Sequence, residues 1–146
     1  METRQLKKPL EPGKGLVRPS STSGMPGLLS ALMAAAPRFH KLHLKVKGPG
    51  SYAAHSALNS LYSDLPGHVD DLAEQYKGAT ETLLTIPEAS GKPELQTVQE
   101  ALSYLRELYD HVSLVQDSCP YSEINNTLDE VKSLINSSKY KLLFLA

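Results

Sequence analysis

The chain has 146 residues, which is enough for one domain with one hydrophobic core and too few for two. It has no tryptophan and only 6% aromatic residues, a composition that suits an aliphatic helical core and not a β-sandwich. The single cysteine, Cys119, excludes a disulfide framework and a thiolate zinc site. No apolar run approaches the roughly 20 residues that span a bilayer, so we expect a protein that is neither membrane-bound nor secreted.

Residues 1–27 are expected to form an extended N-terminal arm. They contain four of the ten prolines and four of the nine glycines, with few apolar side chains to bury. Basic residues outnumber acidic ones here, and some of them could contact phosphates: Lys7, Lys8, Lys14 and Arg18. No aromatic side chains alternate with these charges, so nucleic-acid binding is the weaker interpretation. A linker, or an arm that docks on a partner, fits better.

From residue 28 the apolar residues follow a helical period. Spacings of three and four residues predict four amphipathic helices, over residues 28–47, 51–78, 95–115 and 124–142. We expect Pro37 and Pro66 to kink or interrupt the first two helices, because proline removes a backbone donor. Ser51 is expected to cap the second helix and Gly78 to end it. Short links between such helices predict an all-α, antiparallel four-helix bundle over residues 28–146.

Four side chains in the first two predicted helices have the chemistry of metal ligands. A tight turn at residues 48–50 would bring His43 and His55 close together, and Asp70 and Glu74 lie one helical turn apart. Imidazole and carboxylate together suit iron, manganese or zinc. The same residues also fit two packing histidines and a solvated acidic face.

Other parts of the sequence narrow the kinds of metal site. No Glu-x-x-His or His-Glu-x-x-His motif occurs, which disfavours a di-iron oxygenase inside the bundle and a zinc protease. His40 and His68 lie one turn from the predicted ligands and would be either outer partners that orient a ligand or exposed bystanders. No catalytic residue beyond the four predicted ligands is assigned.

The order of these residues resembles the Dps-like branch of the ferritin superfamily. The run His43 to Gly48, the segment Tyr52 to His55, and Asp70 to Glu74 match that family's signature with identical spacing. The resemblance implies a ferritin-like bundle in a homo-oligomer. Histidines of one subunit and the acidic pair of its twofold mate would bind iron and oxidise it with peroxide or oxygen. Asn59 stands where the family has an acidic ligand, and the link at residues 79–93 has no room for the family's additional helix.

The segment from Gly50 to Gly78 also resembles short phage-encoded proteins of the same ferritin-like kind. Two functions are therefore expected as alternatives. One is a phage-type mini-ferritin that binds iron at His43, His55, Asp70 and Glu74 and is ferroxidase-like if active. The other is a non-catalytic virion or assembly protein that docks through its arm. Either would act in the host cytoplasm or in the virion.

Overall fold

The computed structural model describes residues 24–89 and 91–146 of the chain. Its regular elements are all helical: α1 (Gly24–His43), α2 (Ser51–Thr80), α3 (Val98–Ser118) and α4 (Ser122–Phe144). The described ranges contain no strand. The prediction of an all-α fold is thus confirmed. Helix α1 begins four residues earlier than expected, and the four basic arm residues, Lys7, Lys8, Lys14 and Arg18, lie outside the described residues.

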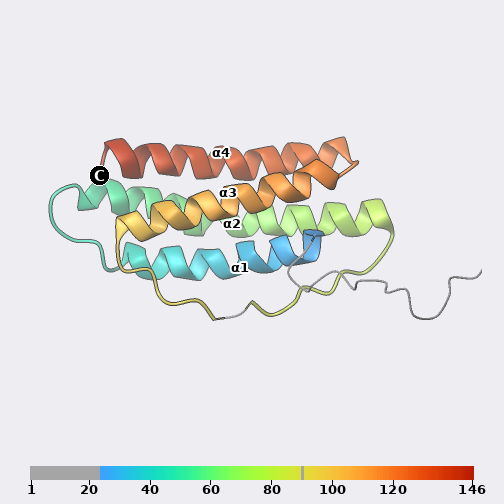
Figure 1. Cartoon of the computed structure of the whole chain (residues 1–146), viewed down its shortest axis with the longest axis horizontal. Helices are drawn as coiled ribbons and strands as arrows, with labels where there is room; N and C mark the ends of the chain where they lie inside the picture. Colours follow the sequence, from blue (N-terminus) through green and yellow to red (C-terminus); the bar gives the residue numbers. More distant parts are fainter. Residues whose placement is uncertain (1–23, 90) are drawn as a thin grey trace, which may run out of the picture.

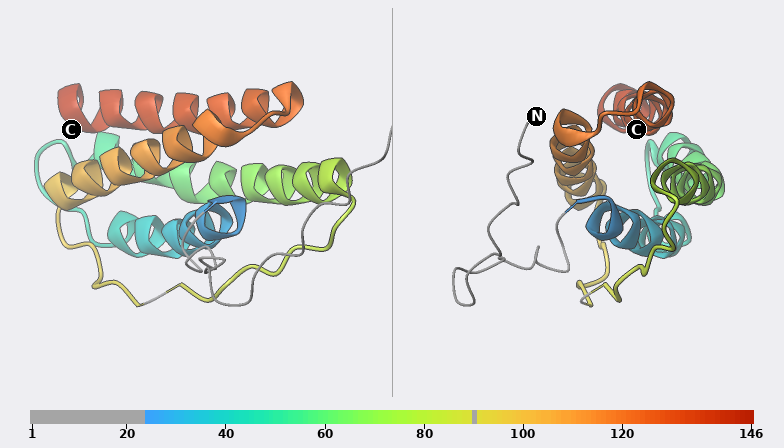
Figure 2. Two further views of the ribbon diagram at one scale, coloured as in Figure 1. Left: turned by 45° about the vertical axis from the view of Figure 1, so that its right-hand side comes forward. Right: turned by 90° about the vertical axis from the view of Figure 1, so that its right-hand side faces the viewer.

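The four helices form a bundle around one core. Seen end-on, they follow one another around the core in the order α1, α2, α4, α3 (Figure 2). Each helix runs antiparallel to both of its neighbours in this ring, because α2 and α3 point one way while α1 and α4 point the other way (Figure 1). The predicted four-helix bundle with antiparallel neighbouring helices is therefore confirmed.

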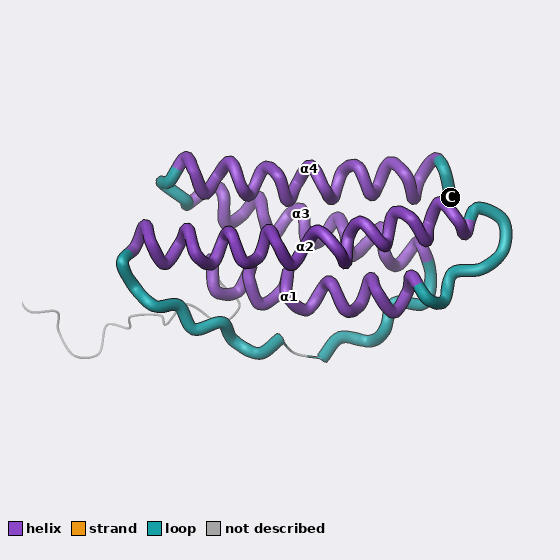
Figure 3. The backbone as a smooth tube through the Cα atoms, turned by 180° about the vertical axis from the view of Figure 1, so that it is seen from behind, coloured by secondary structure: helices purple, strands orange, loops and turns teal. Residues whose placement is uncertain are grey.

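The connection between α2 and α3 was expected to be a short link and is instead a long crossover. It returns over the length of the bundle along the outside of α1, so that α3 starts at the same end as α2 (Figure 3). Ser30 Oγ donates to Pro87 O at 2.6 Å, and an Arg38 amino group donates to Pro93 O at 2.7 Å. Pro87 and Pro93 have no backbone N–H to donate, which disfavours a helix here, and their carbonyls are held by side chains of α1.

Neither internal proline ends its helix. Pro37 lies inside α1 and Pro66 inside α2, and both side chains are exposed. A proline in a helix costs about 3 kcal/mol. The apolar residues around each proline, among them Phe39 and Leu65, are almost completely buried. Burial of a large apolar side chain stabilises by about 1.5–3 kcal/mol, so several such residues outweigh the lost hydrogen bond.

The ends of α2 also differ from expectation. Gly50 is the cap residue, with φ of 78°, and Ser51 is the first helical residue without a side-chain capping bond. At the other end the helix continues past Gly78 to Thr80, and Glu81 adopts the left-handed conformation. Leu95 is buried as expected, but it lies in the connection because α3 begins at Val98. The spacing of apolar residues thus predicts that a helix forms here, but it predicts the first and last residues of that helix poorly.

The core is aliphatic, as the composition indicated. Its largest fully buried side chain is Phe39, whose ring centroid lies 5.3 Å from that of Tyr104, and buried leucines of all four helices belong to the same core. None of the described helices is both long and apolar enough to cross a membrane.

Candidate metal-binding face

His43 and His55 lie against each other at one end of the bundle. His43 is the last residue of α1, and His55 lies in the second turn of α2. The turn between the helices uses Gly48 and Gly50, both with positive φ, which lets the chain reverse within seven residues. The two imidazole rings stack with centroids 3.7 Å apart, and His55 Nδ1 lies 3.2 Å from the backbone oxygen of His43.

This contact fixes the roles of the His55 nitrogens. When Nδ1 of a neutral His55 donates to the carbonyl of His43, its Nε2 keeps a free lone pair. The same bond satisfies one of the carbonyls that a helix leaves unpaired at its C-terminus. His55 is exposed, so its Nε2 is open to a ligand.

His43 is held in its neutral form. Its side chain is 7% exposed, and its Nδ1 is buried with no hydrogen-bond partner among the described residues. Burial lowers the pKa of His43, and positive charge on His55 or His40 would lower it further. Neutral imidazole is the form that binds metals. The unpaired nitrogen also leaves a buried polar atom that a ligand or water could satisfy.

Tyr62 and His40 complete an aromatic cluster with the two histidines. The rings of His40 and Tyr62 stack with centroids 4.0 Å apart, and the rings of Tyr62 and His43 meet edge to face with centroids 5.0 Å apart. The Tyr62 hydroxyl donates to Asn59 Oδ1 at 2.7 Å. Tyr62 was not among the residues that the sequence singled out. Its position seven residues after His55, two turns along the same face, is the signal that could have found it.

The structure places His40 and His68 in different surroundings. The ring centroid of His40 lies 5.8 Å from that of His43, so it packs beside this residue while stacking on Tyr62. His68 Nδ1 instead lies 3.7 Å from a carboxylate oxygen of Glu130 on α4. Only His40 therefore belongs to the cluster.

Asp70 and Glu74 lie on α2 far from the histidines. Both side chains are exposed and one turn apart, as the spacing predicted. Fifteen residues separate His55 from Asp70, which is about 22 Å along a helix that rises 1.5 Å per residue. Beside Asp70 is a shallow hollow of about 140 Å³ that Met33 and Pro66 help to line. Within the described part of the chain, no three metal-binding side chains are close enough to hold one ion.

The described part of the chain thus places the four candidate ligands as two separate pairs, which we call half-sites. The histidine half-site comprises His43 and His55, and the acidic half-site comprises Asp70 and Glu74. At 100° per residue, Asp70 lies about 60° and Glu74 about 100° around the axis of α2 from His55, so Asp70 is near the side of α2 that carries His55 and Glu74 is turned further away.

Comparison with known proteins assigns the chain to a protein family. Residues 43–142 match DUF5856, described as a family of unknown function. This matched range begins at His43 and includes all four predicted ligands. A relative in Enterobacteria phage T4, an uncharacterized 14.6 kDa protein in the mobD-ri intergenic region, is 32% identical over 128 residues, which is 84% of this chain and 93% of the relative. No solved structure matches the chain. The protein therefore belongs to the DUF5856 family, with a relative in a bacteriophage.

Proposed function

We propose that the protein is a phage-type mini-ferritin that binds ferrous iron between two subunits. The observation that supports this is the separation of the two half-sites. His55 and the two carboxylates occur along α2 at ferritin-like spacing, with His43 of α1 beside His55, but His55 and Asp70 are about 22 Å apart, too far to share an ion within one chain.

A twofold axis would join the half-sites. If two copies pack α2 against α2 in antiparallel fashion, an axis midway between His55 and Asp70 passes near Tyr62 and Ser63. Each histidine half-site then faces the acidic half-site of the partner, and the dimer gains two equivalent sites. Residues near the middle of this face are suited to contact, since Met33 is 53% exposed and Pro66 is exposed as well.

The chemistry of the half-sites supports iron. Carboxylates are hard ligands and imidazole is intermediate, a combination found in non-haem iron sites. Neutral His43 and a free Nε2 on His55 are ready to donate lone pairs. In the proposed reaction each ferrous ion gives one electron to peroxide or dioxygen, as the Dps-like resemblance implies.

The connectivity of the four helices also supports a ferritin-like fold. Ferritin-like bundles have one long crossover connection among otherwise short links, and this chain has its long connection between α2 and α3. Short turns join α1 to α2 and α3 to α4.

The test is ferrous-iron binding measured anaerobically, followed by the rate of ferric-iron formation after oxygen or peroxide is added. Asp70→Asn with Glu74→Gln should abolish both, because a neutral amide is a poor ligand for a hard cation. Asp71→Asn is the matched control, since Asp71 is the neighbouring exposed carboxylate on α2. Equal iron binding by the wild type and the Asp70/Glu74 variant would refute the proposal.

Mixing variants tests the inter-subunit arrangement directly. One variant lacks the histidines (His43→Ala, His55→Ala) and the other lacks the acidic pair (Asp70→Asn, Glu74→Gln). Each alone should be inactive. A mixed dimer contains one site with both changes and one intact site, so mixing should restore up to one site per mixed dimer. Mixing without recovery would show that the sites are not shared between subunits.

One observation favours the alternative, a non-catalytic virion or assembly protein. Asn59 stands at the third ligand position of the Dps-like signature, and its side-chain oxygen accepts the Tyr62 hydroxyl. That hydrogen bond competes with any role as a ligand. Under this alternative the wild type and the acidic-pair variant would bind iron equally poorly, whereas deleting residues 1–23 would reduce incorporation into phage particles.

A further inference from the structure

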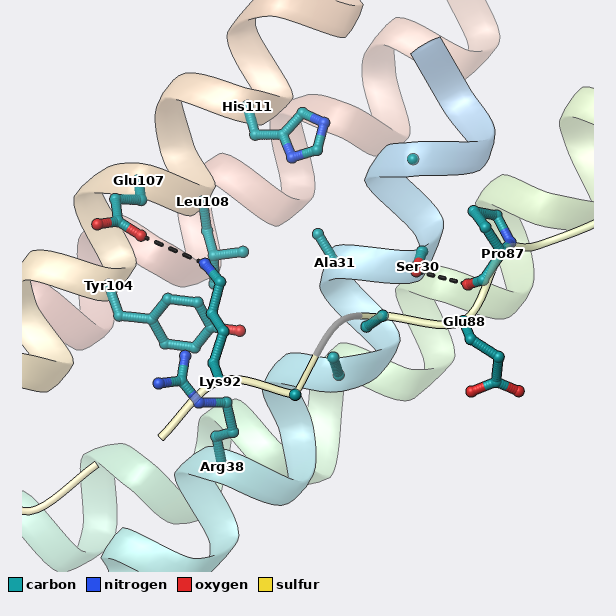
Figure 4. Close-up of a pocket in the computed structure, with 14 residues that line it drawn as sticks. Ser30, Ala31, Arg38, Pro87, Glu88, Lys92, Tyr104, Glu107, Leu108 and His111 are labelled. Carbon is teal, nitrogen blue, oxygen red and sulfur yellow. Dashed lines mark hydrogen bonds and ion pairs between the residues drawn. The ribbon is translucent and has the colours of Figure 1, made fainter. Parts of the chain in front are cut away.

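A second hollow lies on the opposite side of α1, between α1, the crossover connection and α3 (Figure 4). We call it the α1–α3 hollow. Its volume is about 400 Å³, within the range of small-molecule sites. Gly27, Ala31 and Ala34 form its floor on α1 and Leu108 contributes an apolar side chain from α3. From Gly27 to Arg38 the floor extends eleven residues, or about 16 Å of helix.

One end of the hollow contains a cation, Arg38, that has no carboxylate partner among the described residues. The guanidinium of Arg38 lies 4.1 Å from the ring centroid of Tyr104, and one amino group donates to Pro93 O. Its Nε is buried with no hydrogen-bond partner in the described part of the chain. None of the ion pairs among the described residues includes Arg38.

The remaining charged groups do not neutralise Arg38. Lys92 pairs with Glu107, with 3.6 Å between Nζ and the carboxylate oxygen. Glu88 is exposed and its carboxylate extends away from Arg38 (Figure 4). The hollow therefore has an apolar floor with a net positive end.

The other polar groups of the lining are neutral near pH 7. Burial raises the pKa of the Tyr104 hydroxyl by more than the neighbouring Arg38 lowers it, so the hydroxyl stays protonated. At the far end, burial lowers the pKa of His111, and the charge of Lys92 lowers it further. Neither group supplies the missing negative charge.

We propose that the α1–α3 hollow binds a small organic anion, a carboxylate on a flat apolar body, with the carboxylate on Arg38 and the body along the floor of glycine and alanine. Guanidinium and carboxylate form charge-assisted, often bidentate hydrogen bonds. The floor lacks bulky side chains, so a ring can lie directly on α1. This site is separate from the histidine and acidic half-sites and does not depend on iron binding.

Naphthoate and its neutral amide, naphthamide, serve as probes with nearly the same shape. Binding to the ¹⁵N-labelled full chain is followed by backbone amide shifts, which should be largest at Ala31, Ala34 and Leu108. We expect naphthoate to bind about tenfold or more tightly than naphthamide, the ratio typical of one charge-assisted contact.

Two variants separate the charge from the shape. Arg38→Gln should bring the affinity ratio of naphthoate to naphthamide close to one while naphthamide still binds. Ala31→Leu should weaken both probes because it fills the floor and leaves the charge in place. Arg106→Gln, a change at an exposed arginine of α3, should alter neither affinity. Equal affinity for the two probes in the wild type, an unchanged ratio in Arg38→Gln, or unchanged binding in Ala31→Leu would each overturn the proposal.

Discussion

Three glycine-to-alanine substitutions test how the turn between α1 and α2 is stabilised. Gly48 and Gly50 both have a positive φ, a conformation that costs an alanine about 1–2 kcal/mol. An added Cβ at Gly48 meets nothing within 4 Å, whereas at Gly50 it would lie 2.4 Å from the carbonyl carbon of Ala146. Gly67 is helical and its surroundings are open.

The three substitutions should therefore give three different results. Gly48→Ala should lower the free energy of unfolding by about 1–2 kcal/mol through backbone strain alone. Gly50→Ala should lower it by about 2–4 kcal/mol, because residue 146 must also move away from the start of α2. Gly67→Ala should raise it by about 0.5–1 kcal/mol, since alanine is the better helix former.

Urea unfolding followed by circular dichroism measures all three variants. The denaturant dependence of the free energy should stay constant, which shows that only stability has changed. Equal losses for Gly48→Ala and Gly50→Ala would refute the close approach of residue 146 to the turn. A destabilised Gly67→Ala would refute the open helical environment.

Two further predictions concern a helix cap and pH. Thr97→Ala should lower the free energy of unfolding by about 1 kcal/mol in the same assay, because Thr97 Oγ accepts a hydrogen bond from the Glu100 amide at 3.1 Å in a capping box. The control, Thr82→Ala at an exposed threonine, should change it little. Equal effects of the two substitutions would contradict the cap. The pKa values of His43 and His111 are lowered in the folded protein, so the unfolded chain binds protons more readily. The free energy of unfolding should therefore be highest above the ordinary histidine pKa of about 6.5 and should fall as the pH drops below it. His43→Gln should reduce this pH dependence, and adding His111→Gln should reduce it further; an unchanged slope in the double variant would contradict these burial effects.

The spacing of apolar residues was sufficient to predict the four helices and their antiparallel bundle. A helix in a small domain must bury one face, so its buried residues recur at three and four positions, and this period is visible without a structure. The same local logic predicted that His43 and His55 would meet, because only a short glycine-containing turn separates their helices. It also predicted that Asp70 and Glu74 would share one face of α2.

The tertiary structure alone decided how the helices follow one another around the core. Periodicity says which face is buried but not against which helix, so the long crossover between α2 and α3 was missed. The contact between Arg38 on α1 and the ring of Tyr104 on α3, which joins distant parts of the chain, was equally invisible. Such contacts depend on how several helices and connections pack together. Local patterns in a single sequence do not reveal this packing.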